Sequence, residues 1–128
     1  MVDKARAPAS KQLGDEAEAR ALAHLQGQGL RLVERNYRVA RGPRARGGEI
    51  DLILRDRDGT LVFVEVRSRG SGGQGGAAAS IGPAKLASLR LAAHHYLMRL
   101  PVMPACRFDV VAIDKGCIEW IPGAFDGG

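Results

Sequence analysis

The sequence predicts an α/β domain in which helices flank a central sheet, in the order helix, strand, hairpin, helix and further strands. Two observations favour this class. Apolar residues recur at helical spacing in residues 10–26 and 83–100, whereas the intervening and following segments are runs of Ile, Leu and Val bounded by glycine-containing turns. The 128 residues suit one domain, which we expect to span residues 13–122 between two loosely attached tails, residues 1–12 and 123–128.

The first helix is expected to begin at Ser10, a suitable N-cap, and to reach about Gln26, before two glycines that end it. Glu18, Leu22 and Leu25 recur at helical spacing, so Glu18 shares the face that should pack on the sheet. Two interpretations remain open. Glu18 either meets a partner at the sheet, or is a first-turn glutamate that the helix dipole favours and that tilts toward water.

A strand over residues 30–39 and a basic loop over residues 41–48 are expected next. There are six arginines and one acid between Arg31 and Arg46, and the chain has a net charge of +5. This pattern favours contact with the phosphate groups of a nucleic acid, and the alternative is a solvated strand and loop. The residues expected to bind nucleic acid are Arg38, Arg41, Arg44, Arg46 and, after the hairpin, Arg69.

Residues 48–67 are predicted to form a β-hairpin. Its turn ends in Asp58-Gly59, which suits a three-residue loop closed by Asp56 and Thr60, with the glycine in the left-handed conformation. The turn fixes the register of the two strands, because a slip of one residue would move every side chain to the other face of the sheet.

That register places Asp51 opposite Glu65, with Glu49 opposite Arg67 on the same face. The other face is expected to be core and carries Ile50, Leu52, Leu54, Val62, Val64 and Val66. Two facing carboxylates destabilise a sheet when both are charged, so a cation is expected there, and hard oxygen ligands prefer Mg²⁺ or Mn²⁺. The alternative is a water-exposed face on which Glu49 and Arg67 neutralise the pair.

Residues 68–80 contain five glycines and no large apolar side chain, so we expect either a plain flexible connection or a lid that orders over a ligand. Pro83 suits the first turn of a helix that reaches about Leu100. Lys85 lies in this turn. Its ammonium group either extends toward the acids or a phosphate, or remains at the surface.

The last two strands are predicted over residues 107–113 and 117–121. The residues expected to share their core face are Phe108, Val110, Ala112, Ile118 and Trp120. Arg107 and Asp109 lie on the opposite face, where we expect them to pair with neighbouring charges in a structural role.

The sequence carries no sign of export. No apolar run approaches 18 residues, and residues 1–12 lack the apolar core of a signal peptide, so we expect a cytoplasmic protein. Cys106 and Cys117 have neither a metal-ligand spacing nor a secreted-type framework, and free thiols are expected. His94 and His95 have no metal-ligand partner at helical spacing and are expected at the surface.

The chain resembles the YraN-like family of small bacterial proteins over about residues 14–125. The resemblance is carried by Gly14 with Glu18, the run Gly48-Glu49-Ile50-Asp51-Leu52-Ile53, the run Phe63-Val64-Glu65-Val66-Arg67-Ser68-Arg69, Lys85, and the run Arg107-Phe108-Asp109-Val110-Val111. It implies the restriction-endonuclease-like PD-(D/E)xK fold, a mixed central sheet flanked by helices, which is similar to that of archaeal Holliday junction resolvases.

The resemblance also implies roles for individual residues. Asp51 and Glu65 match the two acids of the nuclease motif, and Glu18 looks like the helix glutamate that the resolvases use beside their metal. These three residues are the implied ligands of Mg²⁺ or Mn²⁺. Lys85 is expected at the scissile or a neighbouring phosphate, and Arg67 occupies the position where the signature has lysine.

The expected function is therefore that of a metal-dependent endonuclease-like protein that hydrolyses phosphodiester bonds in branched or single-stranded DNA. Arg67 motivates an alternative, because arginine stays charged and cannot serve as a base. In that alternative the protein is a catalytically silent nucleic-acid-binding or assembly module on the same fold. A third, weaker interpretation is a protein-interaction domain. Similar resolvases work as dimers, so a homodimer is one further expectation.

Overall fold

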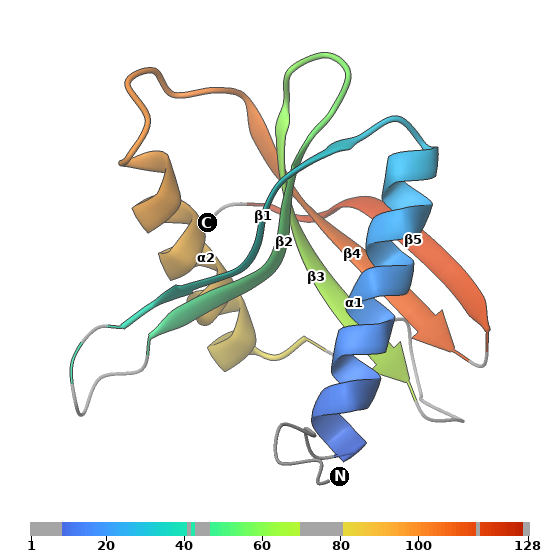
Figure 1. Ribbon diagram of the computed structural model, residues 1–128. Coiled ribbons are helices and arrows are strands. Elements are labelled where there is room, and N and C mark those ends of the chain that lie inside the picture. The colour runs from blue at the N-terminus through green and yellow to red at the C-terminus, as the bar shows by residue number, and fades with distance from the viewer. Residues whose placement is uncertain (1–8, 41, 43–46, 70–80, 115, 127–128) are drawn as a thin grey trace, which may run out of the picture.

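The computed structural model describes residues 9–40, 42, 47–69, 81–114 and 116–126 of the chain. The elements, in chain order, are α1 (Ala9–Gly27), β1 (Arg31–Val39), β2 (Gly48–Arg55), β3 (Leu61–Arg69), α2 (Pro83–Leu97), β4 (Cys106–Asp114) and β5 (Cys117–Phe125). The strands form one five-stranded sheet in the order β1-β2-β3-β4-β5 (Figure 1). The predicted class, a mixed α/β sheet flanked by helices, is confirmed, and it fits a restriction-endonuclease-like fold broadly.

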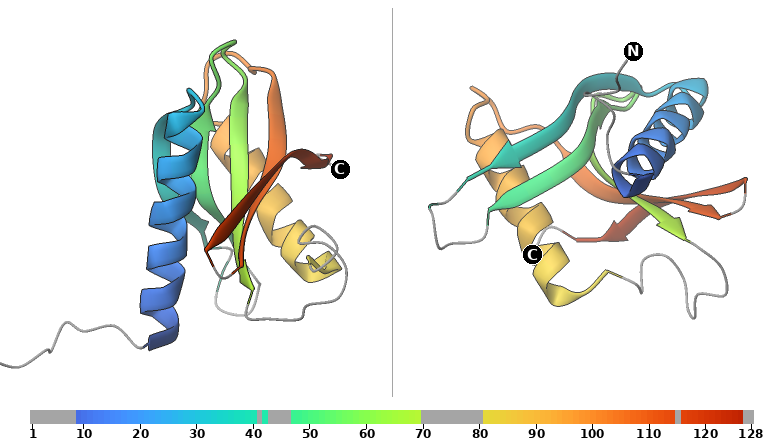
Figure 2. Two further views of the ribbon diagram at one scale, coloured as in Figure 1. Left: turned by 90° about the vertical axis from the view of Figure 1, so that its right-hand side faces the viewer. Right: turned by 60° about the horizontal axis from the view of Figure 1, so that its bottom comes forward.

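The sheet is mixed because one of its connections crosses over. β3 and β4 run parallel, whereas the other neighbouring strands are antiparallel. Parallel neighbours need a long crossover, which here includes α2. The two helices cover opposite faces of the sheet, with α1 on one side and α2 on the other (Figure 2). Within the described ranges, no helix is long and apolar enough to cross a membrane.

Two elements end three or more residues from the predicted position. α2 ends at Leu97 rather than near Leu100, and the residues that follow form a turn. β5 extends to Phe125 instead of ending at Ile121, because Phe125 pairs with Phe108 and stacks on its ring at 5.2 Å. Residues 123–125, which we assigned to a loose tail, therefore belong to the sheet. Of the other expected tail, residues 9–12 belong to α1, and residues 1–8 lie outside the described part of the chain.

The predicted register of the central hairpin is confirmed. Leu52 pairs with Val64 and Ile53 with Phe63, as the three-residue turn required. The Asp56 backbone N–H donates to the Thr60 carbonyl oxygen at 2.8 Å. Gly59 has a φ of 91°, the left-handed conformation that made glycine necessary in this loop.

The alternation of residues in the hairpin suggested that one of its faces is exposed to water, but both faces are covered. Ile53 and Phe63, on the acidic face, are buried in a cluster beneath α2, while Leu52 and Val64 are buried in a second cluster beneath α1. Both faces are covered because a helix packs on each of them. The interpretation of Asp51 and Glu65 as acids on a water-exposed face is therefore wrong.

We expected the apolar residues of β2 to form one continuous core face, but that face is interrupted. Ile50 packs beneath α2, whereas Leu52, two residues along the same strand, packs beneath α1. Residues at this spacing share a face in a regular strand, so β2 turns over at Asp51, the residue between them. The other apolar residues of the predicted core face keep their positions on the α1 side.

The last hairpin has a different face assignment from the predicted one. Ile118 pairs with Ile113 and Trp120 with Val111, and both pack against the cluster beneath α1. Facing residues of an antiparallel pair lie on the same side of the sheet, so Ile118 and Trp120 do not share a face with Val110. The prediction failed because both sides of β4 are buried, which removes the alternation that would identify a core face.

Arg107 and Asp109 form a structural charge pair, as predicted. The fully buried Asp109 carboxylate accepts hydrogen bonds from Arg107 Nε at 3.0 Å, Trp120 Nε1 at 2.9 Å and the Gly123 N–H at 2.9 Å. Arg107 also binds Asp56 at 2.9 Å. These bonds join the turn between β2 and β3 to both strands of the last hairpin.

The histidines and cysteines also agree with the sequence-based expectation. His94 and His95 are exposed, and the Nδ1 of His95 lies 2.6 Å from the Tyr37 hydroxyl oxygen. Cys106 and Cys117 are exposed free thiols.

Gly48 is required where β2 meets α2. A Cβ added to it would lie 2.5 Å from the Ser88 carbonyl oxygen and 2.8 Å from the Ala92 nitrogen. We therefore expect Gly48→Ala to lower the free energy of unfolding by about 1–3 kcal/mol, measured by chemical denaturation. Gly14→Ala is the matched control, because this helical glycine has nothing within 4 Å of its Cβ position. A gain of about 0.5–1 kcal/mol is expected there. Equal effects of the two substitutions would contradict the packing argument.

Candidate acidic site where the hairpin splits

The candidate site lies where β2 and β3 separate. Their paired residues run from Arg55 with Leu61 to Leu52 with Val64. Asp51 and Glu65 are the next residues on each strand, and beyond them β2 continues beside β1 while β3 continues beside β4 (Figure 1). Asp51 spans the opening, because its Oδ2 accepts a hydrogen bond from the Val66 N–H at 2.8 Å.

Glu65 is a buried acid held by two cations. Its side chain is 3% exposed, and its Oε2 lies 3.2 Å from an Arg67 guanidinium nitrogen and 3.6 Å from Lys85 Nζ. Its other oxygen, Oε1, is buried and accepts no hydrogen bond from the described residues. Buried polar atoms are rarely left without a partner, so this oxygen marks a place where a proton or a cation would be stabilised.

The protonation of the pair follows from its surroundings. Burial, and then the charge of Asp51, raise the pKa of Glu65 to about 8, against the opposing effect of Lys85. Burial also raises the pKa of Asp51, while the Val66 N–H opposes the rise. A hydrogen bond between the two carboxyl groups lowers the pKa of Asp51 and raises that of Glu65. At neutral pH the pair therefore retains one proton between its two carboxyl groups.

Glu18 approaches the pair from α1. Its Oε1 lies 3.9 Å from an Arg35 guanidinium nitrogen, and its side chain is 13% exposed. Burial raises the pKa of Glu18, and the charge of Asp51 raises it further, which places this helix acid within electrostatic reach of the strand acids. Among the described residues, however, no group of three or more His, Cys, Asp or Glu side chains is arranged to hold a metal ion.

The donor set fits a hard divalent cation at two carboxylates. Asp51 and Glu65 supply oxygen ligands of the kind that Mg²⁺ and Mn²⁺ prefer, and Glu65 Oε1 has no competing hydrogen-bond donor among the described residues. Glu18 stands beside this pair as an additional acid. The assignment of Asp51, Glu65 and Glu18 as metal ligands stays a prediction.

The structure describes the positions of only some of the basic residues that we predicted to contact DNA or phosphate. Lys85 and Arg67 both lie against Glu65. Arg38 is largely exposed and pairs with Glu49 at 3.4 Å. Arg41, Arg44 and Arg46 lie outside the described residues, as do the side chain of Arg69 and the proposed lid at residues 70–80. The basic loop as a nucleic-acid contact therefore stays a prediction.

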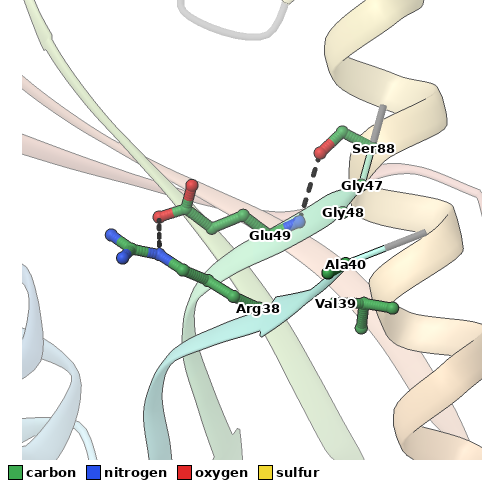
Figure 3. A pocket seen from close by; sticks show the side chains of 7 residues that line it. All are labelled: Arg38, Val39, Ala40, Gly47, Gly48, Glu49 and Ser88. Atoms are coloured by element: carbon green, nitrogen blue, oxygen red, sulfur yellow. Dashed lines mark hydrogen bonds and ion pairs between the residues drawn. The ribbon is translucent and has the colours of Figure 1, made fainter. Parts of the chain in front are cut away.

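A shallow pocket of about 430 Å³ lies between the ends of β1 and β2 and the helix α2 (Figure 3). The Glu49 side chain points toward Arg38 at its rim, and the Glu49 N–H donates to Ser88 Oγ at 3.2 Å. A second pocket, of about 400 Å³, also has Arg38 and Glu49 in its lining and extends to Glu18. The two pockets share this ion pair in their lining, and one extends toward α2 while the other extends toward α1.

Sequence-based reasoning missed two polar residues near the site. Asn36 contacts Glu18, and Ser88 contacts the backbone at Glu49. Asn36 left a signal, because asparagine is unfavourable in a strand and is one of the few residues that adopt the left-handed conformation readily. Nothing in the sequence indicated the role of Ser88, since a serine on a helix is equally compatible with an exposed position.

The fold and this site define a small α/β protein with a buried acid pair at the split end of a hairpin. The chain belongs to the uncharacterised protein family UPF0102, whose model matches residues 17–113. It is 62% identical to a UPF0102 protein of Methylibium petroleiphilum over 91% of this chain and 96% of that one. It is 58% identical to a UPF0102 protein of Paracidovorax citrulli over 97% of this chain and 90% of that one. The YraN-like resemblance is thereby confirmed at the level of the family.

The raised pKa of Glu65 makes stability depend on pH. The folded protein retains a proton that the unfolded chain loses above its ordinary pKa of 4.5, so stability falls as pH rises from about 5 through 8. Glu65→Gln removes this dependence. We expect wild type to lose stability relative to Glu65→Gln, on the order of a few kcal/mol, between about pH 5 and pH 9 in denaturation experiments. A difference that stays constant with pH would contradict the shared proton.

Proposed function

We propose that this protein is a metal-dependent endonuclease-like hydrolase that acts on the phosphodiester bonds of DNA, in branched or single-stranded substrates. The observation that carries the proposal is the Asp51–Glu65 pair, a half-buried acid beside a buried one, in which one buried oxygen of Glu65 accepts no hydrogen bond from the described residues. Such an arrangement costs free energy in an isolated protein, and functional sites are where such costs recur.

Asp51 and Glu65 would hold Mg²⁺ or Mn²⁺, with Glu18 as an additional ligand from α1. The bound ion would neutralise charge on the phosphate and lower the pKa of a water molecule. Glu65 must first release its proton, since a metal ligand of this kind is a deprotonated carboxylate. The Val66 N–H keeps one oxygen of Asp51 in a fixed orientation.

In this proposal Arg67 and Lys85 also interact with the substrate. Both now lie against the Glu65 carboxyl group. When a divalent cation binds there instead, their positive charges become available to a phosphate of the substrate. Arg67 cannot act as a base at the position where the nuclease signature has lysine, so it would stabilise developing negative charge or orient a water molecule.

The arginine-rich segment would contact the DNA backbone away from the cleaved bond. Arg38 is the described member, and it stands at the rim of both pockets beside Glu49. Arg41, Arg44, Arg46 and Arg69 are the remaining proposed contacts. Because these contacts are to phosphates, binding would depend strongly on salt and weakly on sequence.

Arg67 also supports the second candidate, a catalytically silent nucleic-acid-binding or assembly module on the same fold. In that case Arg67 and Lys85 remain permanent partners of Glu65. The protein would bind DNA with a steep dependence on salt and no dependence on a divalent cation.

The test is cleavage of branched, nicked and single-stranded DNA by the pure protein in Mn²⁺. Asp51→Asn and Glu65→Gln are expected to lower the rate by about 100-fold or more, because each removes a charged ligand. Glu119→Gln, an exposed acid on β5, is the matched control and should cleave like wild type. Cleavage that survives both site substitutions would identify a contaminant. Salt-sensitive binding without cleavage, unaffected by Glu65→Gln, would favour the silent module.

A further inference from the structure

Asn36 has an unusual backbone conformation at the level of the acid pair. Its φ is 52°, and among the described residues it is the one non-glycine residue with a positive φ. The neighbouring pairs of β1 and β2 are Arg35 with Leu52 and Tyr37 with Ile50, so Asn36 lies level with Asp51. A residue other than glycine in this region costs free energy, and such residues cluster at functional sites.

The left-handed conformation changes which side chains reach α1. Arg35 and Asn36 are consecutive, and in a regular strand they would point to opposite faces of the sheet. Here both contact the Glu18 carboxylate, whereas the next residue, Tyr37, packs beneath α2. The turn at Asn36 also coincides with the point where β2 changes the face of its apolar residues, between Ile50 and Leu52.

The Asn36 amide is matched to the carboxylate. With its nitrogen toward Glu18, the amide donates to Oε1 and Oε2, both at 3.2 Å. The opposite orientation would set the amide oxygen against two carboxylate oxygens, so the donating orientation is the one assigned. By comparison, the Arg35 contact is long, at 3.9 Å, which makes it the weaker of the two restraints.

We propose that Asn36 is a positioning residue that holds the Glu18 carboxylate beside Asp51, so that the helix acid joins the two strand acids when a divalent cation binds. This inference rests on the proposed metal-dependent function. It explains why the strand carries an unfavourable conformation at this point. A pocket of about 400 Å³ adjoins Glu18 and Asn36, which leaves room for the substrate beside them.

Substitutions separate the amide of Asn36 from its backbone conformation. Asn36→Gly keeps the left-handed conformation without strain and loses the amide, while Asn36→Ala loses both. Arg35→Gln is the matched control, since Arg35 contacts the same carboxylate through an exposed side chain. The affinity for Mn²⁺, measured by calorimetry without DNA, should fall about tenfold in Asn36→Gly. A change below about threefold is expected for Arg35→Gln.

A second measurement needs no metal. Asn36→Gly should lower the Tm by about 2–4 °C in the wild-type background and by much less in Glu18→Ala, because the hydrogen-bond acceptor is already gone. Equal shifts in the two backgrounds would overturn the inference, as would an Asn36→Gly variant that matches wild type in both Mn²⁺ affinity and Tm. If wild type binds no Mn²⁺, the proposed metal-dependent function fails, and the Tm comparison still decides whether Asn36 holds Glu18.

Discussion

The repulsion between Asp51 and Glu65 is the interaction on which the rest of the site depends. The turn of the hairpin fixes the register that brings the two acids together, and two helices bury the sheet that carries them. Two charges cannot both persist there without compensation. The structure compensates in three ways: the pair shares a proton, Arg67 and Lys85 bind Glu65, and the Val66 N–H binds Asp51.

The compensating groups come from two elements of the fold. Arg67 and the Val66 N–H come from β3, and Lys85 comes from the first turn of α2, which the crossover between the parallel strands β3 and β4 brings to this end of the sheet. Glu18 comes from the helix on the opposite face. Both helices therefore contribute side chains around the acids, and the contact of Asn36 with Glu18 adds the edge strand β1.

Local sequence was sufficient for the hairpin but not for the faces of its strands. The Asp58-Gly59 turn determined the register of β2 and β3, because a turn is decided by adjacent residues. The burial of Ile53 and Phe63 was not predictable in this way, since it depends on α2, which is distant in sequence. The same holds for Ile118 and Trp120, whose faces follow from a strand buried on both sides.

The site was predictable to a similar extent. Its acids could be identified because register and helical spacing directed Asp51, Glu65 and Glu18 toward one region. The left-handed turn at Asn36 was indicated only by the residue type, which is not decisive because an isolated asparagine in a strand is compatible with several local structures. The pairing of Arg67 with Glu65, its neighbour on the same strand, was also missed. Cross-strand reasoning had directed Arg67 to Glu49, which instead has Arg38 as an ion-pair partner.

We propose that the acid pair is a cation site, which a proton and the Arg67 and Lys85 side chains occupy when no metal is bound. The most direct test of this proposal is anomalous diffraction from crystals soaked in Mn²⁺. We expect a peak within ligand distance of both Asp51 and Glu65, with Lys85 and Arg67 withdrawn from the Glu65 carboxylate. Crystals that show no peak there at high Mn²⁺ concentration, with both side chains still against Glu65, would contradict it.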